Sequence, residues 1–114
     1  MMARRRRLIS NQGAYHVYNR DELGQPIFAT HAAKQVMMET VLAVAHRFAW
    51  QLHAYAIMTN HFHLVVTTPQ GNLSEGMHAL HSAFANKHKV FRGSPGHVFQ
   101  SRFGCVHYQA VKQA

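Results

Sequence analysis

Residues 50–68 read WQLHAYAIMTNHFHLVVTT, and this stretch decides the fold. Two runs rich in apolar residues, 50–58 and 61–68, are separated only by the polar pair Thr59-Asn60. Short apolar runs around a polar break predict two antiparallel strands joined by a tight turn. Asn60 tolerates left-handed backbone geometry, and we expect it to serve only as a turn residue.

A helix and a strand are predicted on each side of this hairpin. Thr30 can cap a helix that runs to about Phe48, and Asn72 with Glu75 is a capping-box pattern that opens a second helix. Residues 15–20 and 97–108 supply a first and a fourth strand. Each helix carries one apolar stripe: Met37, Val41, Val44, Ala45 and Phe48 in the first, and Leu73, Met77, Leu80 and Phe84 in the second.

This order of elements predicts an α+β, ferredoxin-like βαββαβ fold, in which a four-stranded antiparallel sheet carries both helices on one face. The chain has 114 residues, 47% of them apolar, so we expect one domain over residues 1–114, with residues 1–8 as a flexible basic arm. No apolar run approaches the ~20 residues of a membrane span. Lone Cys105 excludes an internal disulfide, and we expect a cytoplasmic protein without a membrane partner.

The charge favours a polyanionic partner. Twelve Lys and Arg oppose four Asp and Glu, a net charge of +8 with histidine neutral. Each phosphate that a protein neutralises releases counterions, so such an excess favours nucleic acid, although charge alone does not separate DNA from RNA.

His61-Phe62-His63 is the sharpest local motif. On a strand, residues i and i+2 share a face, so both imidazoles point one way while Phe62 points into the core. Two imidazoles on one strand can chelate a divalent cation, and the alternative is two ordinary solvent-facing histidines. A metal needs further ligands, and the four carboxylates offer no obvious third.

Several motifs together carry a resemblance: GAYHV at 13–17, LHAYAIMTNHFHLVV at 52–66, TPQGNLS at 68–74 and GHVFQSRF at 96–103. From about residue 5 to 103, the chain closely resembles the REP-associated tyrosine transposases, a branch of the single-tyrosine HUH transposases of insertion sequences. The resemblance implies that His61 and His63 bind Mg²⁺ or Mn²⁺. It also implies that a tyrosine attacks the scissile phosphate of single-stranded DNA flanked by hairpin-forming palindromes.

The resemblance breaks at the C-terminus. In relatives the fourth strand is followed by a helix that carries the catalytic tyrosine and a further metal ligand, and we expect that helix to be missing here. Tyr108 lies too early to match the family nucleophile. We expect it to be a strand-end aromatic and keep it as a fallback nucleophile. A homodimer in which a second chain supplies the tyrosine is an open alternative.

Candidate DNA contacts are basic residues off the predicted core. Arg102 lies in a family motif, and the remaining ones flank the first strand, lie on the outer face of the second helix or form the basic head. For the head and the helix face, a solvated polar surface is the alternative. The candidates are Arg102, Arg4, Arg5, Arg6, Arg7, Lys87, Lys89, Arg92 and Arg20.

Three functions compete. The first is metal-assisted nicking and rejoining of hairpin-bearing single-stranded DNA in transposition. The second is a catalytically inactive, truncated module that still binds such DNA. A metal-dependent hydrolase of small molecules would account for His61 and His63 but not for the charge or the other motifs.

Overall fold

The central hairpin forms as its sequence predicts. The computed structural model describes residues 14–92, 99 and 103–108, and in it β2 (Gln51–Ile57) pairs antiparallel with β3 (His61–Thr67). The Met58 N–H donates to the His61 carbonyl at 2.8 Å and closes the two-residue turn. The turn does not use the left-handed backbone that Asn60 tolerates: among the described non-glycine residues only Ala49 has a positive φ, of 58°.

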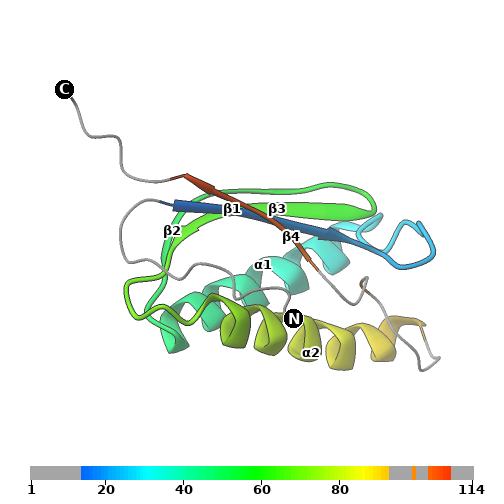
Figure 1. Cartoon of the computed structure of the whole chain (residues 1–114). Coiled ribbons are helices and arrows are strands. Elements are labelled where there is room, and N and C mark those ends of the chain that lie inside the picture. The colour runs from blue at the N-terminus through cyan, green and yellow to red at the C-terminus, as the bar shows by residue number, and fades with distance from the viewer. Residues whose placement is uncertain (1–13, 93–98, 100–102, 109–114) are drawn as a thin grey trace, which may run out of the picture.

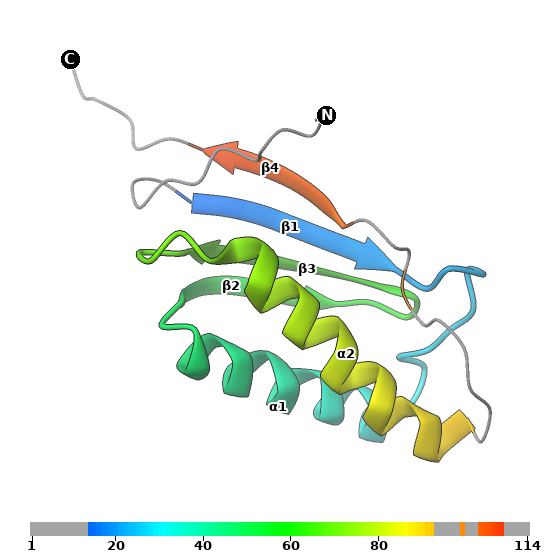
Figure 2. The same cartoon turned by 60° about the horizontal axis from the view of Figure 1, so that its bottom comes forward.

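The sheet has the ferredoxin-like order. β1 (Ala14–Arg20) lies between β3 and β4 (Gly104–Tyr108), which gives the order β2-β3-β1-β4 with all neighbours antiparallel. α1 (His31–Arg47) and α2 (Leu73–Arg92) both cover the same face, and the other face is left open (Figures 1 and 2). The predicted α+β fold class is therefore confirmed.

The core lies between the helices and the covered face of the sheet. Alternate residues of β1 and β3 point into it, and both predicted helix stripes are buried there, apart from half-buried Phe48. The Thr30 hydroxyl caps α1 by accepting from the Ala33 N–H at 3.0 Å, as expected. No helix in the described part of the chain is long and apolar enough to cross a membrane.

The start of the fourth strand and the cap of α2 differ in detail from the prediction. The fourth strand starts at Gly104 rather than at residue 97, and Phe99 forms only an isolated bridge with Asp21. The ring of Phe99 is buried 5.4 Å from that of Phe62, and Phe103, directly before β4, is not part of a strand. The other residues of the predicted strand before Phe103, 97, 98 and 100–102, lie outside the described residues. α2 begins at Leu73, directly after Asn72 as predicted, but the Asn72 side chain binds other partners than the helix end: it accepts from the Trp50 indole at 3.0 Å and donates to the Phe48 carbonyl at 3.0 Å.

Candidate active site

The open face of the sheet collects the histidines of the hairpin and the polar residues of β1. In the β1–β3 register, Tyr18 lies opposite His63 and Arg20 opposite His61. Because side chains alternate along a strand, these four and His16 share the face that the helices leave free. Phe62, between the two histidines, is fully buried, as its position predicted.

His61 is oriented by the residue before it. Its Nδ1 lies 2.8 Å from Oδ1 of Asn60, an atom that can only accept, so Nδ1 carries the proton and Nε2 keeps a free lone pair. Asn60 is itself fixed, because its side-chain amide donates to the Gly24 carbonyl at 3.4 Å and its own carbonyl accepts from the Asp21 N–H at 3.1 Å. The expected role of Asn60 as a turn residue only was therefore incomplete.

His63 has a partner on the neighbouring strand. Its Nδ1 lies 2.9 Å from Nε2 of His16, and the two rings are stacked with centroids 5.1 Å apart. When Nδ1 of His63 donates this bond, its Nε2 is left with a free lone pair, as in His61. Burial lowers the pKa of His63, and the positive charges of His16 and then His61 lower it further. The ring is thereby kept neutral, which is the form that binds metal.

The two histidines fit a divalent cation as part of its coordination shell. Their rings lie 5.1 Å apart, and each has its Nδ1 occupied in the way that metal-binding histidines commonly have. Within residues 14–92, 99 and 103–108, no group of three or more His, Cys, Asp and Glu side chains is placed to hold a metal. This part of the chain thus supplies two imidazoles, and oxygen ligands such as water or phosphate would complete the shell of Mg²⁺ or Mn²⁺.

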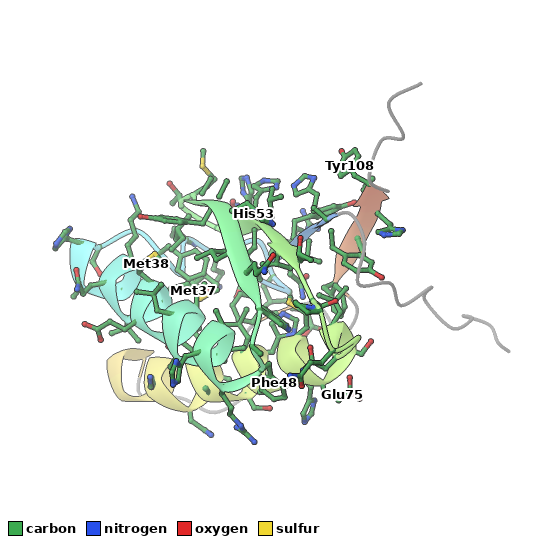
Figure 3. All side chains as sticks on the ribbon, turned by 90° about the vertical axis from the view of Figure 1, so that its left-hand side faces the viewer. Met37, Met38, Phe48, His53, Glu75 and Tyr108 are labelled. Carbon is green, nitrogen blue, oxygen red and sulfur yellow. The ribbon has the colours of Figure 1, made fainter. Side chains whose placement is uncertain are left out.

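Tyr108 lies on the same open face but at the other end of the sheet. It pairs with Ala14, whereas His61 pairs with Arg20, so six residues of β1 separate the two positions. At 3.2–3.4 Å per residue this is about 20 Å. Tyr108 is 55% exposed at the end of β4, on the side away from α1 and α2 (Figure 3). It is a strand-end aromatic, and the tyrosine beside the histidines is Tyr18, whose ring lies 5.8 Å from that of His63.

Of the predicted basic contacts, Arg20 lies in this site. Its exposed side chain extends from the end of β1 onto the open face. Lys87 is on α2, on the covered side of the sheet, where its ammonium donates to the Thr40 hydroxyl of α1 at 3.2 Å. The remaining predicted contacts lie outside the described residues or have side chains outside them: Arg4, Arg5, Arg6, Arg7, Lys89, Arg92 and Arg102.

Sequence reasoning missed His16 and the neighbouring Tyr18 as parts of the site. A signal was present, since residues 16 and 18 alternate with the apolar core positions Tyr15 and Val17 just as His61 and His63 alternate with Phe62. The sequence pattern does not contain the register between β1 and β3. That register places residues 16 and 18 beside His61 and His63 on the same face of the sheet.

The comparisons with known proteins concern the family and the fold. Residues 10–114 match the family model described as "Transposase IS200 like". Among solved structures, the chain is similar to a REP-associated tyrosine transposase bound to a REP hairpin (15% identity, TM-score 0.76, 96% of this chain and 64% of that one). It is also similar to a candidate transposase from Deinococcus radiodurans R1 (17% identity, TM-score 0.70, 93% of this chain and 85% of that one). No curated protein matches the chain.

At these identities the two structures establish the fold alone, and the chain spans less than two thirds of the first of them. The family assignment rests instead on the family model, which covers nearly the whole sequence. The chain therefore belongs to the IS200-like transposase family.

Proposed function

We propose that this chain nicks and rejoins single-stranded DNA that folds into hairpins, with His61 and His63 holding Mg²⁺ or Mn²⁺. The observation that supports this most directly is the pair of imidazoles on an open sheet face, each with its Nδ1 hydrogen bonded to a neighbouring side chain. The net charge of +8 supplies the attraction for a DNA strand. The hairpin bound by the similar REP-associated transposase points to the same substrate class.

The residues of the site have distinct tasks in this proposal. His61 and His63 present two lone pairs from one rigid strand, while Asn60 and His16 fix their ring orientations through Nδ1. When bound, the cation polarises a non-bridging phosphate oxygen and neutralises charge that develops on the phosphate. Arg20, beside His61, is placed to contact a neighbouring phosphate of the strand.

The covalent step needs a tyrosine. Its hydroxyl oxygen attacks phosphorus and loses its proton, a 5′-phosphotyrosyl bond forms, and the P–O3′ bond breaks to release a 3′-OH. Tyr108 of the same chain lies about 20 Å along β1 from His61, too far to reach a phosphate held there. Tyr108 acts in this step only if a second copy brings it to the histidines. Tyr18 is the described tyrosine within reach in the same chain.

A covalent-adduct assay tests the proposal. The protein is mixed with a labelled single-stranded hairpin from its own flanking repeats and Mn²⁺, and the products are separated on a denaturing gel. We expect a shifted band that His61→Ala abolishes and that His53→Ala preserves. His53 is the matched control because its ring, on β2, is bonded to the Thr67 hydroxyl at 2.8 Å and not to the site. Peptide mapping of the adduct, with Tyr18→Phe and Tyr108→Phe, identifies the nucleophile.

The second candidate function is an inactive module that binds hairpin DNA. Two observations favour it: the described residues supply only two metal ligands, and Tyr108 lies far from them. DNA binding that weakens with salt, without any adduct under the same conditions, would support this module and contradict nicking.

A further inference from the structure

We propose that the hollow beside His61 binds one nucleotide of the substrate strand, with the base stacked on Tyr18 and the phosphate against Arg20. This inference rests on the proposed function, because it names the part of the DNA that the same site takes. It adds a stacking platform to the metal pair, and that platform determines which nucleotide of the strand lies at the histidines.

The hollow has the size of a single ring system. It encloses about 180 Å³ at the end of β1 and is lined by Tyr18, Asn19, Arg20, His61 and Gly104. Pockets for drug-sized ligands usually hold roughly 300–1,000 Å³, so this volume suits one planar group. Because His61 is part of its wall, an occupant of the hollow is a direct neighbour of any group held at the histidines.

Gly104 allows the Tyr18 ring to lie against β4. These residues are paired across β1 and β4, and a Cβ on Gly104 would lie 2.1 Å from Cε1 of Tyr18. The rings of His16 and His63 flank the phenol, with centroids at 5.3 and 5.8 Å. The ring is thus held in place while 39% of Tyr18 stays exposed, so a base can stack on it without first ordering the side chain.

Arg20 supplies a cation at the rim of the same hollow. Its backbone N–H donates to Oδ1 of Asn19 at 2.9 Å, and no carboxylate of the described residues pairs with its guanidinium. The nearest carboxylate in sequence, Asp21, is buried and its Oδ2 accepts from the backbone N–H groups of Leu23 and Gln25. A guanidinium that no described carboxylate neutralises, next to an exposed aromatic ring, is the combination that binds a base and its phosphate.

The test follows base stacking directly and needs no metal or nicking. A set of hairpin-forming single strands carries 2-aminopurine at successive unpaired positions next to the base of the stem. The fluorescence of the 2-aminopurine is recorded during titration with protein in EDTA. We expect quenching on binding at one position. Tyr18→Leu should remove that quenching and weaken binding roughly 5- to 100-fold, while Tyr18→Trp should retain it. Arg20→Gln should lower the slope of log affinity against log salt by about 1.

Gly104→Ala tests the platform with Tyr18 unchanged, because the added methyl group must displace the ring. We expect it to reduce quenching as Tyr18→Leu does, with the fold of each variant checked by circular dichroism. The matched controls are Tyr55→Leu and Lys34→Gln, both at exposed positions away from the hollow, and they should bind like the wild type.

The outcomes separate this inference from the proposed function. Quenching that depends on Tyr18, without any covalent adduct in Mn²⁺, would support the nucleotide site and contradict nicking. Two results would overturn the nucleotide site alone, provided that the wild type forms the covalent adduct. Either 2-aminopurine fluorescence is quenched at no position, or Tyr18→Leu and Gly104→Ala quench it as the wild type does.

Discussion

Nε2 of His16 lies 2.9 Å from Nδ1 of His63, although 47 positions separate the two residues in the sequence. The bond joins the middle of β1 to the strand that carries the two proposed metal ligands, and it occupies Nδ1 of His63 as Asn60 occupies Nδ1 of His61. The two rings would otherwise rotate independently about their Cβ–Cγ bonds. Each proposed ligand is therefore held by a separate hydrogen bond from a different element.

Removing the acceptor at position 16 should weaken metal binding. His16→Phe keeps an aromatic ring but offers nothing to Nδ1 of His63, and we expect the affinity for Mn²⁺ to fall about 10- to 100-fold. His16→Gln retains an acceptor and should lose less. Mn²⁺ binding is measured by electron paramagnetic resonance of the free ion, and the tautomer of the His63 ring by ¹⁵N NMR of the metal-free protein.

His53→Phe is the control for that series, since His53 bonds to Thr67 on a different part of the sheet. If His16→Phe bound Mn²⁺ like the wild type and left the His63 tautomer unchanged, the bond from His16 would have no role in preparing the ligand.

Much of the fold could be predicted because local patterns determine it. Alternation placed Phe62 in the core and the two histidines outside it, and the helical stripes identified the buried faces of α1 and α2. The place of Phe99 could not be predicted from its local pattern, because its ring packs against those of Phe28 and Phe84, which are distant in sequence.

Only the part of the site that lies on a single strand could be predicted. His61 and His63 are neighbours in the sequence, whereas the role of His16 depends on the register between β1 and β3. The role of Asn60 depends on the loop after β1, where the Asp21 N–H bonds to its carbonyl and the Phe28 N–H bonds to that of Thr59 at 2.8 Å. Such contacts arise from tertiary packing, and no local pattern encodes them.

The stability of the protein should fall as pH drops from 6.5 toward 4, because of His81. Burial lowers its pKa to about 4, with a smaller effect of the His78 charge, and its ring packs 4.9 Å from that of Phe99. Above pH 6.5 both folded and unfolded chains hold His81 neutral. Below it the unfolded chain takes up the proton first, so the free energy of unfolding decreases by at most about 3 kcal/mol at pH 4.

Urea unfolding at a series of pH values measures this decrease. His81→Gln should remove most of it, since the amide does not titrate and its oxygen can still accept from Asn19, as Nε2 of His81 does at 3.4 Å. Ser82→Ala, at an exposed position of α2, is the control and should keep the wild-type pH dependence. Equal pH dependence in His81→Gln and the wild type would contradict the assignment.

Gly76→Ala should destabilise the protein although alanine favours helices. A Cβ at this position of α2 would lie 2.1 Å from Cζ2 of Trp50, and that ring is buried and fixed by its bond to Asn72. We expect a loss of about 1–3 kcal/mol from overpacking, against a gain of about 1 kcal/mol in helix propensity. Thermal unfolding measures the difference. Ser82→Ala, exposed on the same helix, should leave stability unchanged or raise it slightly.

Ala49→Gly should stabilise the protein, in contrast to Gly76→Ala. Ala49 follows the C-cap of α1 with φ 58°, and the next residue, Trp50, closes the helix end by donating to the Ala45 carbonyl at 2.8 Å. A left-handed residue with a Cβ costs roughly 1–2 kcal/mol, and glycine avoids that strain at some expense in unfolded-chain entropy. We expect a net gain of about 0.5–1 kcal/mol in the free energy of unfolding, measured by urea denaturation. Ala43→Gly, exposed in the middle of α1, should instead lose about 1 kcal/mol, so an equal loss in both variants would show that the backbone at position 49 is not strained.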